Sequence, residues 1–204
     1  MNVAWLRHGG NWNTQPYALG YLSEKLRAEN RVRLDITSGA PITDEGLAGA
    51  HLAWLTGTDA FTLSEAEVGA LRRFLADGGT LFVNAVGGAR EFAGSARRLL
   101  RDLFADTDVR RRPLTTDAEL LTGKLGEYRG PKIDDMEELA RERTIAWREV
   151  QPGLSANFLE RYAQEDRTFA IYAPRGIHDT LDGHTALSAW SFMPEAARNL
   201  AANI

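Results

Sequence analysis

Residues 64–88 read SEAEVGALRRFLADGGTLFVNAVGG and predict a helix, a turn and a buried strand in succession. Ser64 and Glu67 have the spacing of a capping box, in which each side chain satisfies a backbone amide of the other residue. The apolar residues that follow recur every three or four positions, and glycine at Gly78-Gly79 supplies a left-handed end to the helix. Thr80–Val83 is almost entirely apolar, as expected of a central strand that helices cover on both faces.

The same alternation of apolar strands and amphipathic helices extends along the rest of the chain. Further strands are predicted at 3–6, 32–36, 51–55 and 168–172, the second of them near an edge of the sheet. Helices are predicted from a cap at Thr14 to Asn30, over the apolar positions from Phe92 to Phe104, and after Pro194. Strands that alternate with helices favour right-handed crossovers. We therefore expect an α/β fold of three layers, with a doubly wound, mostly parallel sheet of about five strands.

Length and composition favour one globular domain. The chain has 204 residues, of which 44% are hydrophobic and 25% charged, and we assign 1–204 to a single domain with a less regular segment at 106–167. No stretch approaches the roughly 18 apolar residues of a membrane span, and the N-terminus lacks a signal-peptide pattern, so we expect a soluble, cytoplasmic protein without membrane contact. The net charge of -4 argues against a nucleic-acid partner. The absence of cysteine excludes disulfides and thiol nucleophiles.

Polar residues of four loops are expected at one rim of the sheet. In an open parallel sheet, ligands bind beyond the carboxyl ends of the strands, where loops and helix N-termini converge. We expect a binding site there for a small polar ligand or a protein partner. Its candidate residues are His8, Asn11, Trp12, Asn13, Thr58, Asp59, Asn84, Arg90, Glu91, Arg175, His178, Asp182 and His184. Trp12 is equally suited to line this pocket or to pack its own loop against the protein.

A nucleophile is missing from this rim. The loop after Val83 has the strand, glycine turn and helix of a nucleophile elbow, yet Asn84-Ala85-Val86-Gly87 offers no hydroxyl or thiol. An alternative function is a hydrolase that activates water through a metal or a histidine. Its candidate groups are His8, His178, His184, Asp59, Glu91 and Asp182. Their spacing matches no zinc signature, so we favour a solvated turn and expect neither metal nor cofactor.

Two surface features and one further histidine complete the candidates. The arginines at 97, 98, 101 and 110–112 are interpreted as a solvated helix face and loop, with an anionic partner as the alternative. A third functional class, an interaction module of a larger bacterial assembly, would expose an apolar patch. Trp5, Trp147 and Trp190 are candidates for that patch, although we favour core positions for them. His51, at the start of a buried strand, is interpreted as structural.

Several short motifs resemble, in their order and spacing, a bacterial family of domains of unknown function. They are Gly10-Asn11-Trp12-Asn13, Leu55-Thr56-Gly57 with Phe61, Leu63 and Ser64, Leu71-x-x-Phe74-Leu75-x-x-Gly78-Gly79, Gly88 with Phe92 and Ser95, Tyr172-Ala173-Pro174, Gly183-His184 and Asn203-Ile204. The resemblance covers nearly the whole chain except its middle third. It implies a flavodoxin-like domain similar to class I glutamine amidotransferases, with a last helix that continues beyond Ile204. Those enzymes carry a cysteine near the position of Ala85-Val86, so cysteine-dependent glutamine hydrolysis is excluded here.

Overall fold

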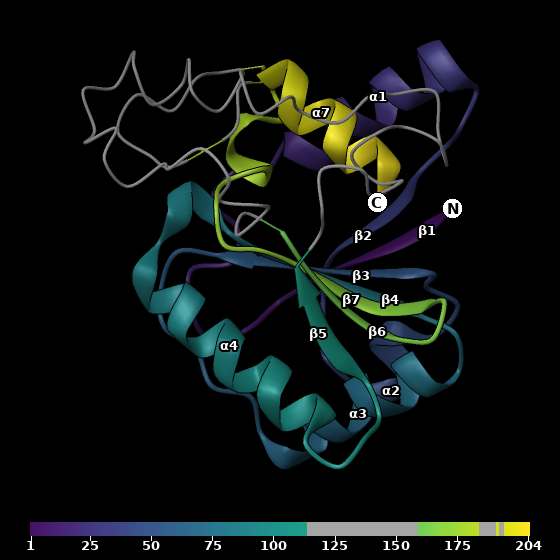
Figure 1. Ribbon diagram of the computed structural model, residues 1–204. Helices are drawn as coiled ribbons and strands as arrows, with labels where there is room; N and C mark the ends of the chain where they lie inside the picture. Colours follow the sequence, from purple (N-terminus) through teal and green to yellow (C-terminus); the bar gives the residue numbers. More distant parts are fainter. Residues whose placement is uncertain (114–158, 184–190, 192–193) are drawn as a thin grey trace.

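The computed structural model describes residues 1–113, 159–183, 191 and 194–204, and these form an α/β fold around one mostly parallel sheet (Figure 1). Seven strands lie in the described part of the chain, in the spatial order β2-β1-β3-β4-β7-β6-β5. In chain order they are β1 (Asn2–Leu6), β2 (Asp35–Ala40), β3 (Leu52–Gly57), β4 (Thr80–Ala85), β5 (Arg110–Pro113), β6 (Glu160–Gln164) and β7 (Arg167–Ala173). Two of these strands, β5 and β6, go beyond the five that the sequence predicted.

Six of these strands run in the same direction, and β6 runs in the opposite direction. The strands β2, β1, β3, β4 and β7 pair in parallel, as predicted. The strand β4 is the middle strand of the seven-stranded sheet. The strand β6 pairs antiparallel with both β7 and β5. The strand predicted at 32–36 is corrected, because β2 begins only at Asp35 and extends to Ala40. It lies at the sheet edge, as the alternating pattern indicated.

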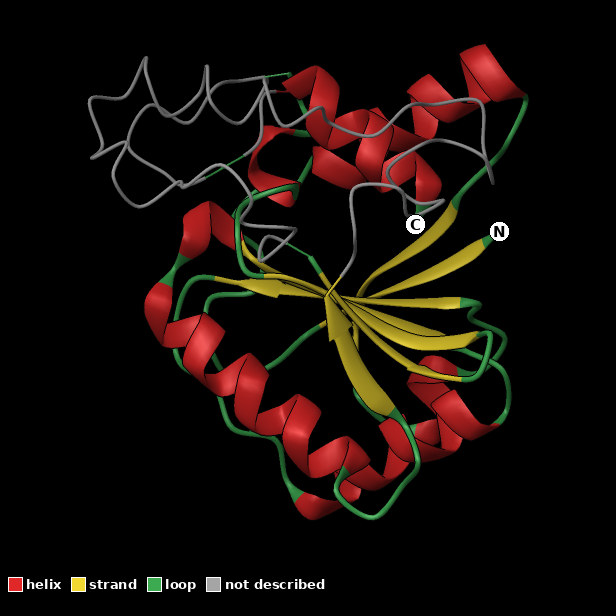
Figure 2. Ribbon diagram, in the orientation of Figure 1, coloured by secondary structure: helices red, strands yellow, loops and turns green. Residues whose placement is uncertain are grey.

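Helices cover both faces of the sheet and complete three layers (Figure 2). One face carries α2 (Asp44–Leu47), α3 (Glu65–Ala76) and α4 (Arg90–Phe104), and the other carries α1 (Ala18–Asn30) and α7 (Pro194–Asn203). Two short 3₁₀ turns, η1 (Val86–Gly88) and η3 (His178–Thr180), follow β4 and β7. No helix in the described ranges is both long and apolar enough to cross a membrane.

The core explains why the central strands are apolar at successive positions. In β4, Leu81 and Val83 pack in the cluster that includes α3 and α4, whereas Phe82 between them packs in the cluster that includes α1 and α7. Successive side chains of a strand point to opposite faces, so a strand covered on both sides is apolar throughout. Phe82 is fully buried, and its truncation to alanine would cost about 3–5 kcal/mol of stability.

The ends of α3 confirm the capping pattern seen in the sequence. The amide of Ser64 donates to Glu67 Oε2 at 2.7 Å, and the amide of Glu67 donates to Ser64 Oγ at 3.3 Å. At the other end, Gly78 has a φ of 108°, a left-handed conformation that favours glycine. The amide of Gly79 then donates to the carbonyl of Phe74 at 3.0 Å, which closes a Schellman motif. The chain therefore passes directly from the end of α3 into β4.

The start of α1 differs from the prediction. The helix begins at Ala18 with Tyr17 at the N-cap position, and no side chain caps it there. The predicted cap, Thr14, lies three residues upstream of that position, in the loop after β1. Because Pro16 disfavours a helical conformation for the residue before it, the first helical turn starts only beyond that proline.

Candidate functional site

The loops that follow β1, β3, β4 and β7 meet at one edge of the sheet. These strands are parallel, so their carboxyl ends share that edge, as predicted. Direct contacts join the loops in pairs: the loop after β1 bonds to Thr56 and Thr58, and Asn84 of β4 bonds to the loop after β7. We call this edge the rim, meaning the loop residues 7–17, 58–63, 86–89 and 174–183.

The rim contains a change of winding direction between β1 and β3. The chain leaves β1 toward α1 on one face of the sheet and leaves β3 toward α3 on the other face (Figure 1). This is a topological switch point, the place in doubly wound sheets where ligands generally bind. Residues just after β1 and β3 lie at this switch point.

His8 supports the loop after β1 from inside the protein. Its Nε2 lies 2.9 Å from the carbonyl oxygen of Thr56, and its Nδ1 accepts from the amide of Gly10 at 3.1 Å. This pairing fits a neutral ring protonated on Nε2. Burial lowers the pKa of His8, although the bond to Thr56 and the carboxylate of Asp59 raise it. With both nitrogens engaged, His8 is oriented to hold the loop and not to bind a metal or take a proton.

Close backbone approach explains the glycine at the end of β3. A Cβ atom on Gly57 would lie 2.8 Å from the carbonyl oxygen of Asn11 and 3.0 Å from the ring of His8. Such distances are too short for non-bonded atoms, so only glycine lets the two loops pack together here. The amide of Thr58 donates to that same carbonyl of Asn11 at 3.2 Å. The two loops at the switch point thus form one rigid unit.

Asn11, Thr58 and Asp59 form a chain of hydrogen bonds on the outer side of this unit. The Nδ2 group of Asn11 donates to Thr58 Oγ1 at 3.2 Å, and that hydroxyl donates to Asp59 Oδ1 at 2.8 Å. Asn11 and Asp59 are exposed and Thr58 is half-buried. We call these three residues the polar triplet. The sequence predicted all three as site residues, because each lies in a loop that follows an apolar strand.

Asn84 faces inward and holds the loop after β7. Its Nδ2 donates to the carbonyls of Ala173 at 3.0 Å and Arg175 at 2.6 Å, and its Oδ1 accepts from the amides of Ile177 at 3.1 Å and His178 at 3.0 Å. The side chain is fully buried and its hydrogen-bonding capacity is filled. The structure therefore places Asn84 as a clamp between β4 and the loop, away from the exposed part of the rim.

His178 lies in an aromatic cluster beneath the rim. Its Nδ1 accepts from Trp54 Nε1 at 3.2 Å, and its ring lies 5.0 Å from that of Trp5. Complete burial lowers the pKa of His178 to about 4, although the backbone of Gln15 and the carboxylate of Asp182 raise it. Nε2 is buried without a hydrogen bond of regular geometry to a described residue. The ring is thus neutral and enclosed near neutral pH.

The tryptophans of this region pack in the core. Trp5 is only 2% exposed and donates from Nε1 to Thr56 Oγ1 at 3.1 Å, so it has the favoured core position and forms no surface patch. Trp12 packs edge-on against Trp5 with ring centroids 5.4 Å apart. Trp12 is half-buried, and of its two suggested roles this contact supports packing of the loop against the protein. Trp147 and Trp190 lie outside the described residues.

The other candidates lie around the rim without a shared geometry. Asn13, Arg90 and Glu91 are exposed, the last two in the first turn of α4, and Arg175 and Asp182 are half-buried. His184 lies outside the described residues. His51 is exposed and does not lie at the rim, since it precedes β3, but its Nδ1 accepts from the amide of Asn2 at 3.0 Å. This bond supports its structural role, and the strand that follows it is buried.

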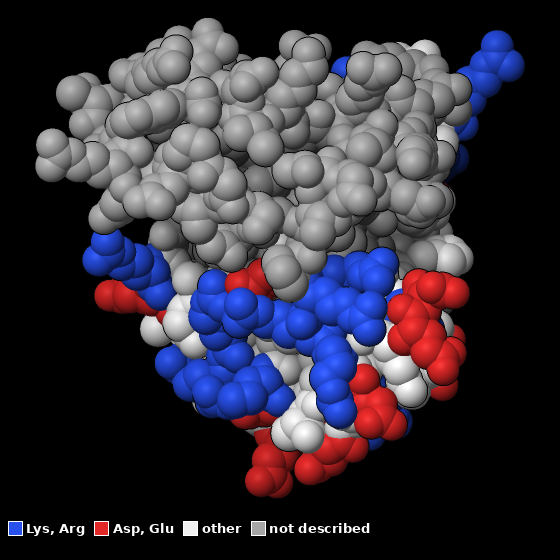
Figure 3. Space-filling view, in the orientation of Figure 1, with Lys and Arg blue, Asp and Glu red and all other residues white. Residues whose placement is uncertain are grey.

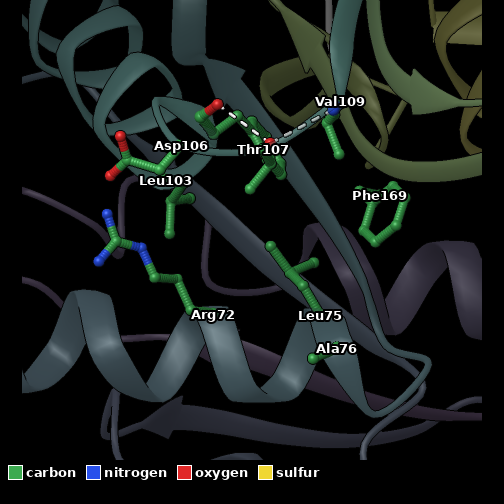
Figure 4. A pocket seen from close by; sticks show the side chains of 9 residues that line it. Arg72, Leu75, Ala76, Leu103, Asp106, Thr107, Val109 and Phe169 are labelled. Atoms are coloured by element: carbon green, nitrogen blue, oxygen red, sulfur yellow. Dashed lines mark hydrogen bonds between the residues drawn. The ribbon is translucent and has the colours of Figure 1, made fainter.

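A cavity of about 320 Å³ lies at the opposite edge of the sheet (Figure 4). Arg72, Leu75 and Ala76 near the end of α3 face Leu103 and Phe104 at the end of α4, with Phe169 of β7 beside them. Apart from Arg72, Asp106 and Thr107, its lining is apolar. Sequence reasoning missed this cavity because its residues have the helical spacing of core positions. It contains none of the predicted site residues.

The described residues contain no group of three or more His, Asp or Glu side chains that could hold a metal ion. Of the predicted metal or base candidates, His8 and His178 turn inward, while Asp59, Glu91 and Asp182 do not meet as a cluster in this part of the chain. The chain has no significant match among curated proteins. The model of one family, described as a domain of unknown function (DUF4159), matches residues 2–204. Nearly the whole chain is covered, and the protein therefore belongs to the DUF4159 family.

Proposed function

We propose that this domain binds a small polar ligand at the switch point between β1 and β3, with the polar triplet Asn11, Thr58 and Asp59 as its central contacts. The observation that carries the proposal is the triplet itself, a chain of hydrogen bonds on the outer surface of a buried support. Exposed polar side chains contribute little to folding stability, so their fixed mutual geometry suits recognition. In doubly wound sheets this is also the position where ligands bind.

The direction of the hydrogen bonds defines the chemistry of the ligand. Asn11 donates one of its two amide hydrogens to Thr58, and Thr58 donates its single hydroxyl hydrogen to Asp59. Beside the second amide hydrogen of Asn11, the groups left to face a ligand are acceptors, namely Oδ1 of Asn11 and Oδ2 of Asp59. A ligand that presents two adjacent donors, such as the hydroxyls of a polyol or sugar or an ammonium group, complements them. Flanking contacts are assigned to Asn13, Arg90, Glu91 and Arg175.

The order of the parallel strands supports a flavodoxin-like architecture, the finer fold that we assign to this domain. Numbered in chain order, the five parallel strands lie as 2-1-3-4-5, which is the flavodoxin-like order, with its switch point between the first and third strands. We assign the domain to the amidotransferase-like variants of this architecture. The chain has no cysteine and supplies no thiol for the glutamine hydrolysis of those enzymes. We assign a binding role without a reaction.

A thermal-shift screen tests the proposal. The purified chain is heated with a panel of sugars, polyols, amines, amino acids, nucleotides and divalent metals. We expect stabilisation by a polyol, a sugar or an amine, and its loss in the Asn11→Ala and Asp59→Ala variants. Asp166→Ala is the matched control, because Asp166 is an exposed carboxylate in the turn between β6 and β7. Stabilisation that survives in both triplet variants, or its absence for the whole panel, contradicts the proposal.

A further inference from the structure

Six arginines gather on the part of the molecule that carries α4 and the antiparallel strands. They are Arg97 and Arg101 of α4, Arg110, Arg111 and Arg112 of β5, and Arg161 of β6. We call them the arginine surface. Basic side chains form one broad area in the space-filling view, and acidic side chains lie mainly at its margins (Figure 3). All but Arg161 are exposed, and Arg161 is half-buried.

Nearby carboxylates neutralise only part of this surface. Glu160 is buried and pairs with Arg97 at 3.0 Å and with Arg111 at 3.4 Å. Asp102 pairs with Arg101 and Asp108 with Arg110, each at 3.5 Å. Among the described residues, three carboxylates thus face six guanidinium groups, which leaves three positive charges in excess. This local excess contrasts with the net charge of -4 for the whole chain, so the surface attracts acidic partners.

Two of these arginines lie directly opposite each other on the neighbouring strands β5 and β6. Arg112 of β5 pairs in register with Arg161 of β6 in an antiparallel ladder. Like charges at such positions destabilise a sheet, because the side chains start only about 5 Å apart. Neither arginine forms an ion pair with any of the residues described. An acid at either position would relieve this repulsion, and so would an anion that binds both guanidinium groups.

The strand β5 also has an open edge. It is the last strand of the sheet order, and within the described ranges no strand pairs with its outer side. Its alternate residues Arg110 and Arg112 lie about 7 Å apart, which is the spacing of alternate side chains in any extended peptide. Arginines on an edge strand can serve simply to prevent aggregation. Protection against aggregation explains the charged residues of β5, but it does not explain why a second arginine, Arg161, lies opposite Arg112.

We propose that the arginine surface binds an acidic segment of a partner protein in extended conformation, which adds as a strand to the open edge of β5. Backbone hydrogen bonds to β5 hold the segment, and acidic side chains at alternate positions pair with Arg110 and Arg112. Arg161 then shares the carboxylate that faces Arg112. The surface uses none of the residues of the polar triplet, so its test is independent of the proposed function.

Fluorescence anisotropy with a labelled, end-capped peptide of ten alternating Glu and Val residues tests the pairing. We expect Arg112→Glu to raise the Kd at least tenfold. The matched control is Arg27→Glu on α1, which makes the same change in net charge at an exposed arginine away from this surface and should change the Kd less than twofold. An equal loss in both variants, or no binding by the unaltered chain, overturns the proposal.

Backbone methylation tests strand addition. In an extended peptide, the amides of alternate residues point to opposite edges, and only one edge of an added strand faces β5. Two peptides are therefore compared, one N-methylated on the odd-numbered residues and one on the even-numbered residues. The peptide whose methylated amides face β5 should lose binding, and the other should keep it. Equal binding by both, or tighter binding of a single-stranded oligonucleotide of the same net charge, overturns the proposal. Arg112→Glu should also raise the melting temperature by about 1 °C or more, because it creates an opposite-charge pair with Arg161. A fall in melting temperature would contradict the like-charge argument.

Discussion

Single buried polar residues determine the shape of the rim. Asn84 holds the loop after β7 through four hydrogen bonds, and His8 holds the loop after β1 through two. Neither faces solvent. Both side chains have the same role, since each forms hydrogen bonds with backbone groups outside regular secondary structure that would otherwise be buried without partners. The loops of the rim are therefore held in place by buried side chains that lie beneath the residues proposed to bind a ligand.

Asn84→Ala tests this support directly. The change removes both donor and acceptor and leaves the buried amides of Ile177 and His178 without their partner. We expect a loss of about 2–4 kcal/mol in the free energy of unfolding, because each buried group without a partner costs about 1–3 kcal/mol. Urea unfolding measures the loss. A change below about 1 kcal/mol would mean that the loop rearranges and that Asn84 is not its clamp.

The burial of His178 predicts a dependence of stability on pH. Its pKa is about 4 in the folded chain and 6.5 when solvated, so between these values the unfolded chain binds a proton that the folded chain does not. This contribution to stability is complete above pH 6.5 and is lost as the pH falls toward 4. At pH 5 the loss should be about 2 kcal/mol. His8, whose pKa is also lowered, acts with the same sign.

The variant His178→Asn isolates this effect. An asparagine retains an oxygen near the position of Nδ1, which can still accept from Trp54, but it does not titrate. Urea unfolding at pH 7 and pH 5 should show a smaller difference for this variant than for the unaltered chain. If the two differences are equal, the ring of His178 is solvated or charged in the folded protein, and the aromatic cluster beneath the rim does not enclose it.

At the scale of elements, the helices and strands that could be predicted are those with a strong local sequence pattern. The helix α3 and the strand β4 carry an N-terminal box, helical spacing, a glycine end and an apolar run, and all four features are confirmed. Strands β5 and β6 carry no such pattern, since β5 reads Arg-Arg-Arg-Pro at an edge. Tertiary pairing makes them strands, since β6 pairs with β7 and β5 pairs with β6, and a single sequence does not show which segment will pair.

The capping box of α3 can be tested with one substitution. Ser64→Ala removes the oxygen that accepts from the amide of Glu67 and the hydroxyl that bonds to its carboxylate. We expect a loss of about 1 kcal/mol in the free energy of unfolding. Thr62→Ala, at an exposed position just before the helix, is the matched control and should change stability by less than about 0.5 kcal/mol. Equal effects of the two changes would show that the cap does not stabilise α3.

At the scale of the whole molecule, topology connects the sequence to a site. The rule that parallel strands end at one edge predicted that Asn11, Thr58 and Asn84, from separate segments, lie at the same edge of the sheet. The rule did not show which side chains turn inward. For Asn84 the alternation of β4 contained that information, because it follows the buried Phe82 by two residues and shares its face. For His8 and His178 only the packed loops determine the direction.

The central claim is that the polar triplet, rather than the cavity at the other edge, receives a ligand. It is tested most directly by ¹H–¹⁵N NMR titration of labelled protein with the compound that stabilises the chain most in the thermal-shift screen. We predict that the largest shift changes arise at the amides of Asn11, Thr58 and Asp59. Changes confined to Leu75, Phe104 and Phe169, which line the cavity, would contradict the claim.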